Sequence, residues 1–194
     1  MDREEVLKIF RDAGALLEGH FILSSGLRSP VYLQCARVLM NTERSARLCR
    51  ALADEVGSKI GAAIELVVSP AMGGVIVGYE MGRQLGVDAI FTERVEGQLQ
   101  LRRGFEIKTG QKILMVEDII TTGLSSRECI SCIRDLGGEV VGAAALIDRS
   151  NGKADVGVPL AALLTLDAPS YEADHIPRAL ADIPAVKPGS RGLR

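Results

Sequence analysis

The sequence has no excess of positive charge. Its 194 residues include 23 basic and 25 acidic side chains, which gives a net charge of −2 and an isoelectric point near 5.8. A protein that binds nucleic acid broadly needs surplus lysine and arginine to neutralise the phosphate backbone. The charge balance therefore disfavours nucleic acid as a general partner.

Long apolar runs are also missing. The longest, residues 156–166, contains Pro159 and Thr165 and is well short of the ~20 residues that a membrane-spanning helix needs. The N-terminus is charged where a secretory signal would become apolar. We therefore expect a cytoplasmic protein with no membrane contact.

Cysteine and histidine are scarce. The chain has two histidines and four cysteines, at positions 35, 49, 129 and 132. Cys129 and Cys132 have the C-x-x-C spacing of redox and zinc sites, but no second pair or nearby histidine completes a zinc site. Both fall on the apolar side of a predicted helix, together with Ile133 and Leu136, where small thiols commonly serve as core residues. We interpret them as structural.

Two common nucleotide-binding signatures are absent. The chain has no G-x-x-x-x-G-K-[ST] loop of the nucleotide triphosphatases. Gly78, Gly82 and Gly86 recur every four residues in a helical segment, which suits close packing and not the G-x-G-x-x-G dinucleotide turn.

What the sequence does contain is a regular alternation of strands and helices. Predicted helices cover residues 4–12, 42–60, 75–85 and 126–136, the second with Thr42 as its cap. Predicted strands cover residues 65–69, 88–92, 113–116, 139–147 and 160–166. This order predicts one α/β domain over residues 1–194 with a largely parallel sheet.

The most informative stretch is residues 113–126, I-L-M-V-E-D-I-I-T-T-G-L-S-S. Four apolar residues predict a strand buried on both faces that brings Glu117 and Asp118 to the sheet edge. A small hydroxylated loop and a helix N-terminus follow, and together these make an anion site. The carboxylates would repel a phosphate, so they should face hydroxyl groups or a divalent cation. A ribose 5-phosphate satisfies both halves of this site.

Residues 116–123 closely resemble the 5-phosphoribosyl-1-diphosphate (PRPP) motif of the type I phosphoribosyltransferases: apolar residues, two acids, two apolar residues, Thr, a small residue, Gly. The resemblance implies that fold, with Glu117 and Asp118 at the ribose. It also implies Mg²⁺ carried by PRPP, with Asp118 as a candidate ligand. The implied anchors of the 5-phosphate are Thr121, Thr122, Gly123, Leu124 and Ser125.

An N-terminal segment resembles one group within the type I phosphoribosyltransferases. Residues 19–34 are similar to the hood of the orotate phosphoribosyltransferases, with a Phe, an apolar residue, Ser-Gly, a basic residue, Ser-Pro and an aromatic residue. We expect this hood to comprise about residues 1–40 and part of the C-terminal tail. The resemblance implies orotate contacts from Ser24, Tyr32 and Thr121. Ser24 stands where many members have lysine, and Arg28 adds a cation nearby.

The segment after the predicted strand 65–69 contains Gly73 and Gly74, whose backbone amides can approach an anion closely. The family places the pyrophosphate of PRPP against this loop. Many orotate enzymes carry Tyr-Lys where this chain has Met72 and Gly73, so one cation is missing.

Residues 94–104 correspond to the flexible catalytic loop of the family, which closes over PRPP and reaches the neighbouring subunit's site in a homodimer. Arg94 matches the first cation of that loop. Gln98 and Gln100 replace a lysine and a histidine that members usually carry, and Arg102 and Arg103 are candidates to supply their charge.

Arg149 follows the predicted strand 139–147 and matches an arginine that holds the carboxylate of orotate, which suits a bidentate guanidinium. The resemblance covers nearly the whole chain and implies an orotate phosphoribosyltransferase that makes orotidine 5′-phosphate and pyrophosphate. Two alternatives stay open: a PRPP-binding regulatory protein without transfer activity, and a phosphoribosyltransferase for another base.

Overall fold

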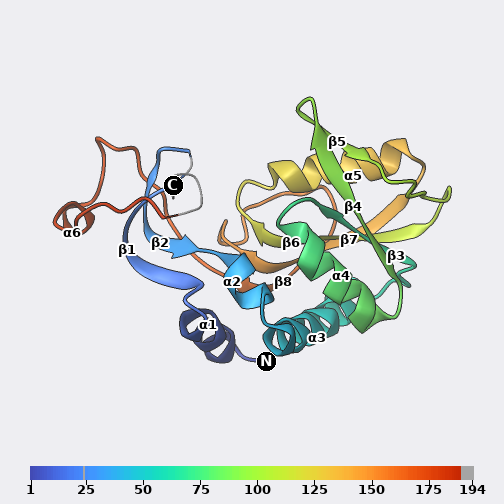
Figure 1. The fold of residues 1–194 in the computed structure, drawn as a ribbon, viewed down its shortest axis with the longest axis horizontal. Coiled ribbons are helices and arrows are strands. Elements are labelled where there is room, and N and C mark those ends of the chain that lie inside the picture. The colour runs from blue at the N-terminus through green and yellow to red at the C-terminus, as the bar shows by residue number, and fades with distance from the viewer. Residues whose placement is uncertain (24, 189–194) are drawn as a thin grey trace.

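The structure is a computed structural model that describes residues 1–23 and 25–188. Its centre is a six-stranded sheet with the strand order β5-β4-β3-β6-β7-β8 (Figure 1). Neighbouring strands are parallel, except that β5 runs antiparallel to β4. The strands are β3 (Leu66–Pro70), β4 (Asp88–Val95), β5 (Gln98–Leu101), β6 (Lys112–Ile120), β7 (Glu139–Asp148) and β8 (Leu160–Thr165). The predicted α/β class with a largely parallel sheet is confirmed.

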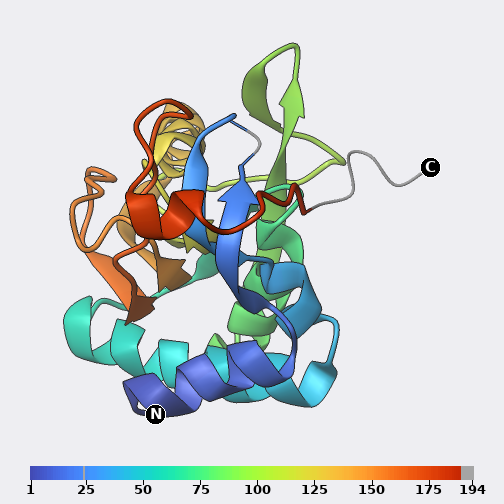
Figure 2. The same cartoon turned by 90° about the vertical axis from the view of Figure 1, so that its left-hand side faces the viewer.

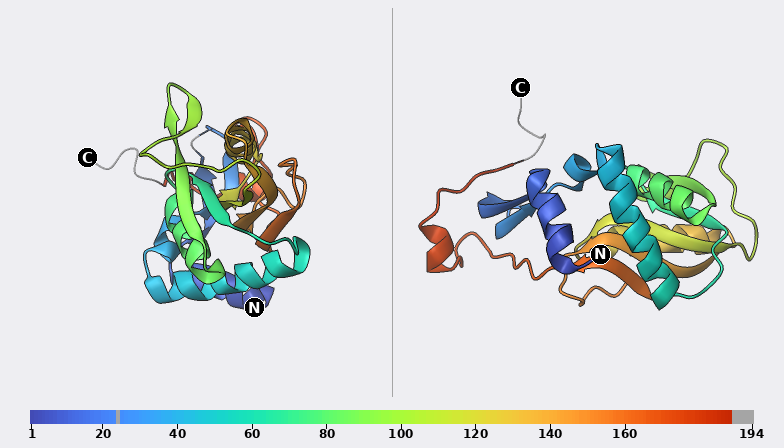
Figure 3. Two further views of the ribbon diagram at one scale, coloured as in Figure 1. Left: turned by 90° about the vertical axis from the view of Figure 1, so that its right-hand side faces the viewer. Right: turned by 90° about the horizontal axis from the view of Figure 1, so that it is seen from below.

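Helices cover both faces of this sheet. On one face lie α3 (Thr42–Lys59) and α4 (Gly74–Leu85), and on the other lies α5 (Leu124–Asp135) (Figures 1 and 3). Side chains of β6 alternate between the two apolar cores: Leu114 and Val116 face α3 and α4, and Ile113 and Met115 face α5. This double burial explains the uninterrupted apolar run at the start of β6. Every helix in the described residues falls short of the length or hydrophobicity of a membrane-spanning segment.

An antiparallel hairpin of β1 (Leu16–Ile22) and β2 (Arg28–Leu33) stands apart from the main sheet at the left of Figure 1, and this side of the molecule faces the viewer in Figure 2. It follows α1 (Arg3–Asp12) and leads into α2 (Cys35–Leu39). The C-terminal segment, which contains α6 (Arg178–Ala181), pairs with both hairpin edges: Tyr171 bonds to the main chain of Arg28, and Val186 to that of His20 and Ile22. Both ends of the chain therefore build one substructure.

Several local predictions need correction. The cap of α3 is Asn41, whose side chain accepts a hydrogen bond from the Arg44 amide at 2.9 Å, and Thr42 is the first helical residue. β6 continues to Ile120, so Glu117 and Asp118 lie within the strand. Leu136 is 45% exposed because it lies just past the end of α5. The short helix α2 was not predicted at all.

The segment predicted as a loop at residues 94–104 contains a strand. β5 pairs with the end of β4, from Thr92↔Leu101 to Val95↔Gln98, and the turn uses positive φ at Glu96 and Gly97. Leu99 points into the core beside α5, whereas Gln98 and Gln100 are exposed. The alternation of apolar and polar residues is real, but four residues are too few to stand out in the sequence.

Candidate active site

The sheet changes its direction of growth between β3 and β6. From β3 the chain moves outward to β4, whereas β7 and β8 follow β6 on the other side. In open α/β sheets such a switch point leaves a crevice outside the carboxyl ends of the strands, where ligands bind. Gly73 and Gly74 follow β3, and Glu117 and Asp118 lie near the end of β6. The fold thus brings together two segments that the sequence indicated separately.

Asp118 lies directly beside Gly73. A β-carbon built on Gly73 would come within 2.9 Å of Asp118 Oδ1 and 3.0 Å of Oδ2. The same carboxylate accepts a hydrogen bond from the Ile119 amide at 2.8 Å. Burial raises the pKa of Asp118, and the bond from Ile119 opposes that shift. In this arrangement of the loop, a side chain at position 73 would therefore press against the carboxylate.

Glu117 is held by the helix that follows it. Ser126, fully buried in the first turns of α5, donates a hydrogen bond from its hydroxyl to Glu117 Oε2. Burial raises the pKa of Glu117 to about 7, the Ser126 bond lowers it, and the charge of Asp118 raises it. The Glu117 carboxyl group therefore titrates near neutral pH.

The loop between β6 and α5, residues 121–123, is the segment predicted to bind an anion and is called the anion loop below. Thr121, Thr122 and Leu124 are exposed, and Ser125 is partly exposed. Gly123 begins α5 with a φ of +73°, a left-handed conformation that favours glycine. Arg127 braces the loop by donating from Nη1 to the carbonyls of Thr122 (2.9 Å) and Asp155 (2.7 Å). These exposed residues lie at the N-terminal end of α5, where the helix dipole is positive.

Arg149 lies just past the end of β7, next to β6 in the sheet. Its amide donates to the Ile120 carbonyl at 2.8 Å, and its Nη2 donates to Ser29 Oγ of β2 at 2.7 Å. The guanidinium is half-buried, and burial lowers its pKa. The preceding Asp148 is not its partner, because that carboxylate accepts from Ser150 and from the Gly152 amide. Within residues 1–23 and 25–188, Arg149 has no carboxylate partner, and a partly buried cation of this kind suits an anionic ligand.

The β4–β5 hairpin and the residues directly after it carry Arg94, Arg102 and Arg103. Two of these arginines form ion pairs with glutamates. Arg94 donates to Glu128 on α5 and to the Gly97 carbonyl. Arg103 forms a bidentate pair with Glu93 at 3.0 and 2.7 Å and lies over the Phe91 ring. Arg102 is exposed. The structure places these cations on one hairpin beside α5 and not in contact with Glu117 or Asp118.

The hood carries two of the predicted orotate contacts, Ser24 and Tyr32. Ser24 lies outside the described residues. Tyr32 packs its ring against Phe21, with ring centroids 5.8 Å apart, and accepts from Gln34 Nε2 at 3.5 Å, so its described contacts stay within the hood.

Sequence reasoning missed the residues that hold the site residues in place: Ser29, Ser126, Arg127 and Glu128. Ser29 and Ser126 are fully buried polar residues. Ser29 stands in the Ser-Pro pair of the hood pattern, but nothing in that pattern indicates its partner Arg149, which lies 120 residues away. The serine at position 126 was visible only as part of a predicted helix.

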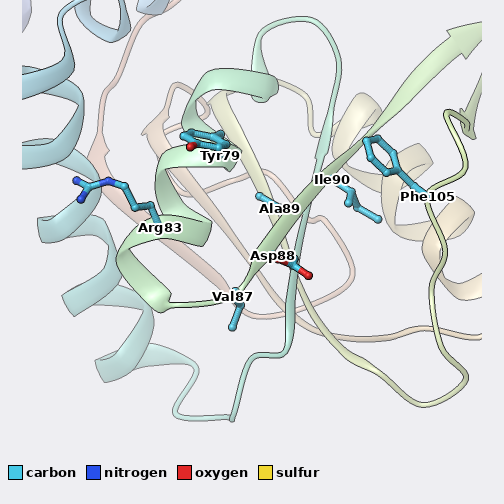
Figure 4. A pocket seen from close by; sticks show the side chains of 7 residues that line it. All are labelled: Tyr79, Arg83, Val87, Asp88, Ala89, Ile90 and Phe105. Atoms are coloured by element: carbon cyan, nitrogen blue, oxygen red, sulfur yellow. The ribbon is translucent and has the colours of Figure 1, made fainter.

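A hollow of about 510 Å³ lies elsewhere, between α4 and the start of β4 (Figure 4). It is lined by Tyr79, Arg83, Val87, Asp88, Ala89, Ile90 and Phe105. None of these is a predicted site residue. The hollow borders the part of the β4 edge that β5 leaves uncovered, because β5 pairs with β4 only from Thr92 onward.

Comparison with protein families gives one matching domain. A model described as the phosphoribosyl transferase domain matches residues 38–157. This range includes β3 to β7, and therefore Gly73, the acid pair, the anion loop and Arg149.

Curated relatives match over the full length. The orotate phosphoribosyltransferase of Rhizorhabdus wittichii is 61% identical over 191 residues, covering 98% of this chain and 97% of that protein. That of Maricaulis maris is 58% identical over 193 residues, covering 100% of both.

Solved structures show the same fold. The orotate phosphoribosyltransferase of Aeropyrum pernix superposes with a TM-score of 0.71 at 28% identity, covering 83% of this chain and 93% of that one. The Mycobacterium tuberculosis orotate phosphoribosyltransferase in complex with PRPP has a TM-score of 0.68 at 27% identity, covering 86% and 97%.

Proposed function

The chain belongs to the orotate phosphoribosyltransferase family, and from that membership we propose that it transfers ribose 5-phosphate from PRPP to N1 of orotate. The products are orotidine 5′-phosphate and pyrophosphate. One observation supports the proposal beyond the family. The acid pair and the anion loop lie at the switch point of the sheet, and Arg149, which has no carboxylate partner among the described residues, lies at the end of the neighbouring strand β7.

The reaction requires no strong base from the protein, because orotate is already an acidic pyrimidine. The difficult step is the departure of pyrophosphate while positive charge grows on the ribose ring. Glu117 and Asp118 would hold the ribose hydroxyls and favour the cationic ring. The anion loop would fix the 5-phosphate, which sets the geometry of the reacting atoms.

The leaving group needs positive charge and hydrogen-bond donors. The amides of Gly73 and Gly74 and the arginines of the β4–β5 hairpin, Arg94 first and then Arg102 and Arg103, are the candidates. Gly73 in place of lysine leaves the hairpin arginines as the main source of protein charge.

Magnesium fits this site only together with PRPP. Within residues 1–23 and 25–188 no group of three or more His, Cys, Asp or Glu side chains could hold a metal by itself. Asp118 is the residue that would share an ion held mainly by the oxygens of PRPP. When bound, such an ion supplies charge that stabilises the pyrophosphate.

We also propose a homodimer in which residues 94–104 reach the partner's site. Support comes from an exposed apolar stripe that begins just before α4: Met72 is 84% exposed, Ile76 48% and Tyr79 69%. Ile76 and Tyr79, three residues apart, lie on one face of α4, and Met72 lies in the turn before the helix. The stripe adjoins the hollow that Tyr79 also lines (Figure 4). A second copy of this chain is the partner to which we assign this surface.

The direct test is the loss of orotate's ultraviolet absorbance on mixing the purified protein with PRPP, magnesium and orotate. Adenine, hypoxanthine and uracil are tested alongside by product assay. We expect turnover with orotate alone. Turnover with another base would change the assigned substrate, and saturable PRPP binding without any turnover would favour a regulatory PRPP-binding protein.

Two variants test the assigned roles. Asp118→Asn removes charge next to the reacting ribose and should lower turnover by about 100-fold or more, whereas Ser125→Ala loses one phosphate contact and should cost about tenfold or less. Steady-state kinetics with PRPP and orotate measure both. Equal losses in the two variants would contradict this division of roles.

A further inference from the structure

One hydroxyl joins three distant parts of the chain. Ser29 is the second residue of β2 and is fully buried. Its hydroxyl donates to the Pro169 carbonyl at 3.1 Å and accepts from Arg149 Nη2 at 2.7 Å and from the Val31 amide at 3.3 Å. A hydroxyl has one donor and two acceptor sites, so all three are in use. The hood, the C-terminal segment and the end of β7 therefore meet at one oxygen atom.

The choice of a neutral partner for Arg149 matters. A carboxylate at position 29 would also fix the guanidinium, but it would neutralise the charge. A serine hydroxyl occupies one N–H of Arg149 and leaves the charge and the other donors for a ligand. The charged residue next to Arg149 in the chain, Asp148, turns its carboxylate toward Ser150 and Gly152.

We propose that Ser29 is a positioning residue, which orients Arg149 toward the carboxylate of the pyrimidine and so makes the hood a determinant of substrate specificity. This inference rests on the proposed function. A bidentate contact with a carboxylate needs the planar guanidinium in one orientation. Arginine has several rotatable bonds, and the contact with Ser29 removes much of that freedom.

The test compares two ligands that differ only in the carboxylate. Orotidine 5′-phosphate carries it and uridine 5′-phosphate does not. Isothermal titration calorimetry gives their dissociation constants, and that of PRPP, for the wild type and for Ser29→Ala. We expect orotidine 5′-phosphate to bind about tenfold more weakly in the variant, with uridine 5′-phosphate and PRPP unchanged. Ser45→Ala, which removes another buried serine hydroxyl on α3, is the matched control.

A second background separates positioning from packing. If Ser29 acts through Arg149, Ser29→Ala should have no further effect on orotidine 5′-phosphate binding in Arg149→Gln. Equal weakening of all three ligands by Ser29→Ala would overturn the proposal, because it would mean a distorted hood. A loss in Arg149→Gln without one in Ser29→Ala would overturn this inference alone. No loss in Arg149→Gln would overturn the orotate contact in the proposed function as well.

Discussion

At the scale of single residues, the acid pair of the site is under electrostatic strain that the fold does not relieve by itself. Two adjacent carboxyl groups are partly buried, and both have raised pKa values, Glu117 to about 7. The described partners of these carboxyl groups are one serine hydroxyl and one amide, with no cation. Buried charge without a counter-charge is unfavourable, so a ligand that brings hydroxyl groups or a metal ion would relieve it.

Glu117→Gln should change how stability depends on pH. The unfolded carboxyl ionises near its ordinary pKa of 4.5 and the folded one at about 7. The folded state therefore binds more protons between these values, so this contribution to stability is complete below pH 4.5 and is lost as pH rises toward 7. The loss amounts to roughly 3 kcal/mol at most. Glutamine does not titrate, so the free energy of unfolding of the variant should rise relative to that of the wild type between pH 4.5 and 7.

Urea unfolding at several pH values without ligands measures that difference. Ser126→Ala is the informative second variant, because the Ser126 hydroxyl of the wild type lowers the pKa of Glu117. Without it, the stability loss should extend to higher pH. Parallel stability curves for the wild type and Glu117→Gln would show that the carboxyl titrates normally.

Gly73→Ala should damage the site while leaving the fold intact. The added β-carbon would lie 2.9 Å from Asp118 Oδ1, and a carboxylate on a short side chain has little room to move. Because a shift of about 1 Å near the reacting atoms can cost 100-fold, we expect turnover to fall by about tenfold to 100-fold. Steady-state kinetics and urea unfolding measure the two effects.

Gly57→Ala on α3 is the control, since no atom outside its immediate chain neighbours and local helix backbone lies within 4 Å of the added β-carbon. It should stabilise the protein by up to about 1 kcal/mol and leave turnover unchanged. Wild-type turnover in Gly73→Ala would mean that Asp118 tolerates displacement.

At the scale of elements, the sequence predicts what depends on local pattern and misses what depends on distant contacts. β6 and α5 are clear because their apolar periods differ. The cap of α3 is ambiguous, since Asn41 and Thr42 are both good caps and only the bond to Arg44 decides. The pair of Arg94 with Glu128 and that of Arg149 with Ser29 join residues 34 and 120 positions apart, which no period reveals.

The Arg94–Glu128 pair ties the β4–β5 hairpin to the helix that begins at the anion loop. If Arg94 binds the pyrophosphate, PRPP must compete with Glu128 for it. Glu128→Gln removes the competing charge, so the affinity for PRPP should rise several-fold while stability changes by less than about 1 kcal/mol. Titration calorimetry at two salt concentrations measures this.

Glu55→Gln, which breaks an exposed pair with Lys59 on α3, is the matched control and should leave PRPP affinity unchanged. Weaker PRPP binding in Glu128→Gln would mean that Glu128 holds Arg94 in its working position and does not compete with the ligand.

At the scale of the whole molecule, the chain exposes the apolar stripe of Met72, just before α4, and Ile76 and Tyr79 on α4, of which Tyr79 also lines the hollow. Tyr79→Glu places a charge on this surface and should convert a dimer to a monomer in analytical ultracentrifugation. Leu136→Glu is the control, because Leu136 is 45% exposed but lies at the end of α5. An unchanged mass in Tyr79→Glu would exclude the stripe as the subunit contact.

Mixing two inactive variants tests whether the sites are shared. Asp118→Asn removes the carboxylate charge at the ribose site, and Arg94→Ala removes the guanidinium of the hairpin. In a mixed two-fold dimer, one site would combine the intact Asp118 of one subunit with the intact Arg94 of the other, provided that the hairpin acts across the interface. Random exchange of subunits should then restore about one site in four. If Arg94 serves its own subunit, no site in the mixture is complete, and turnover stays at the level of the two parents.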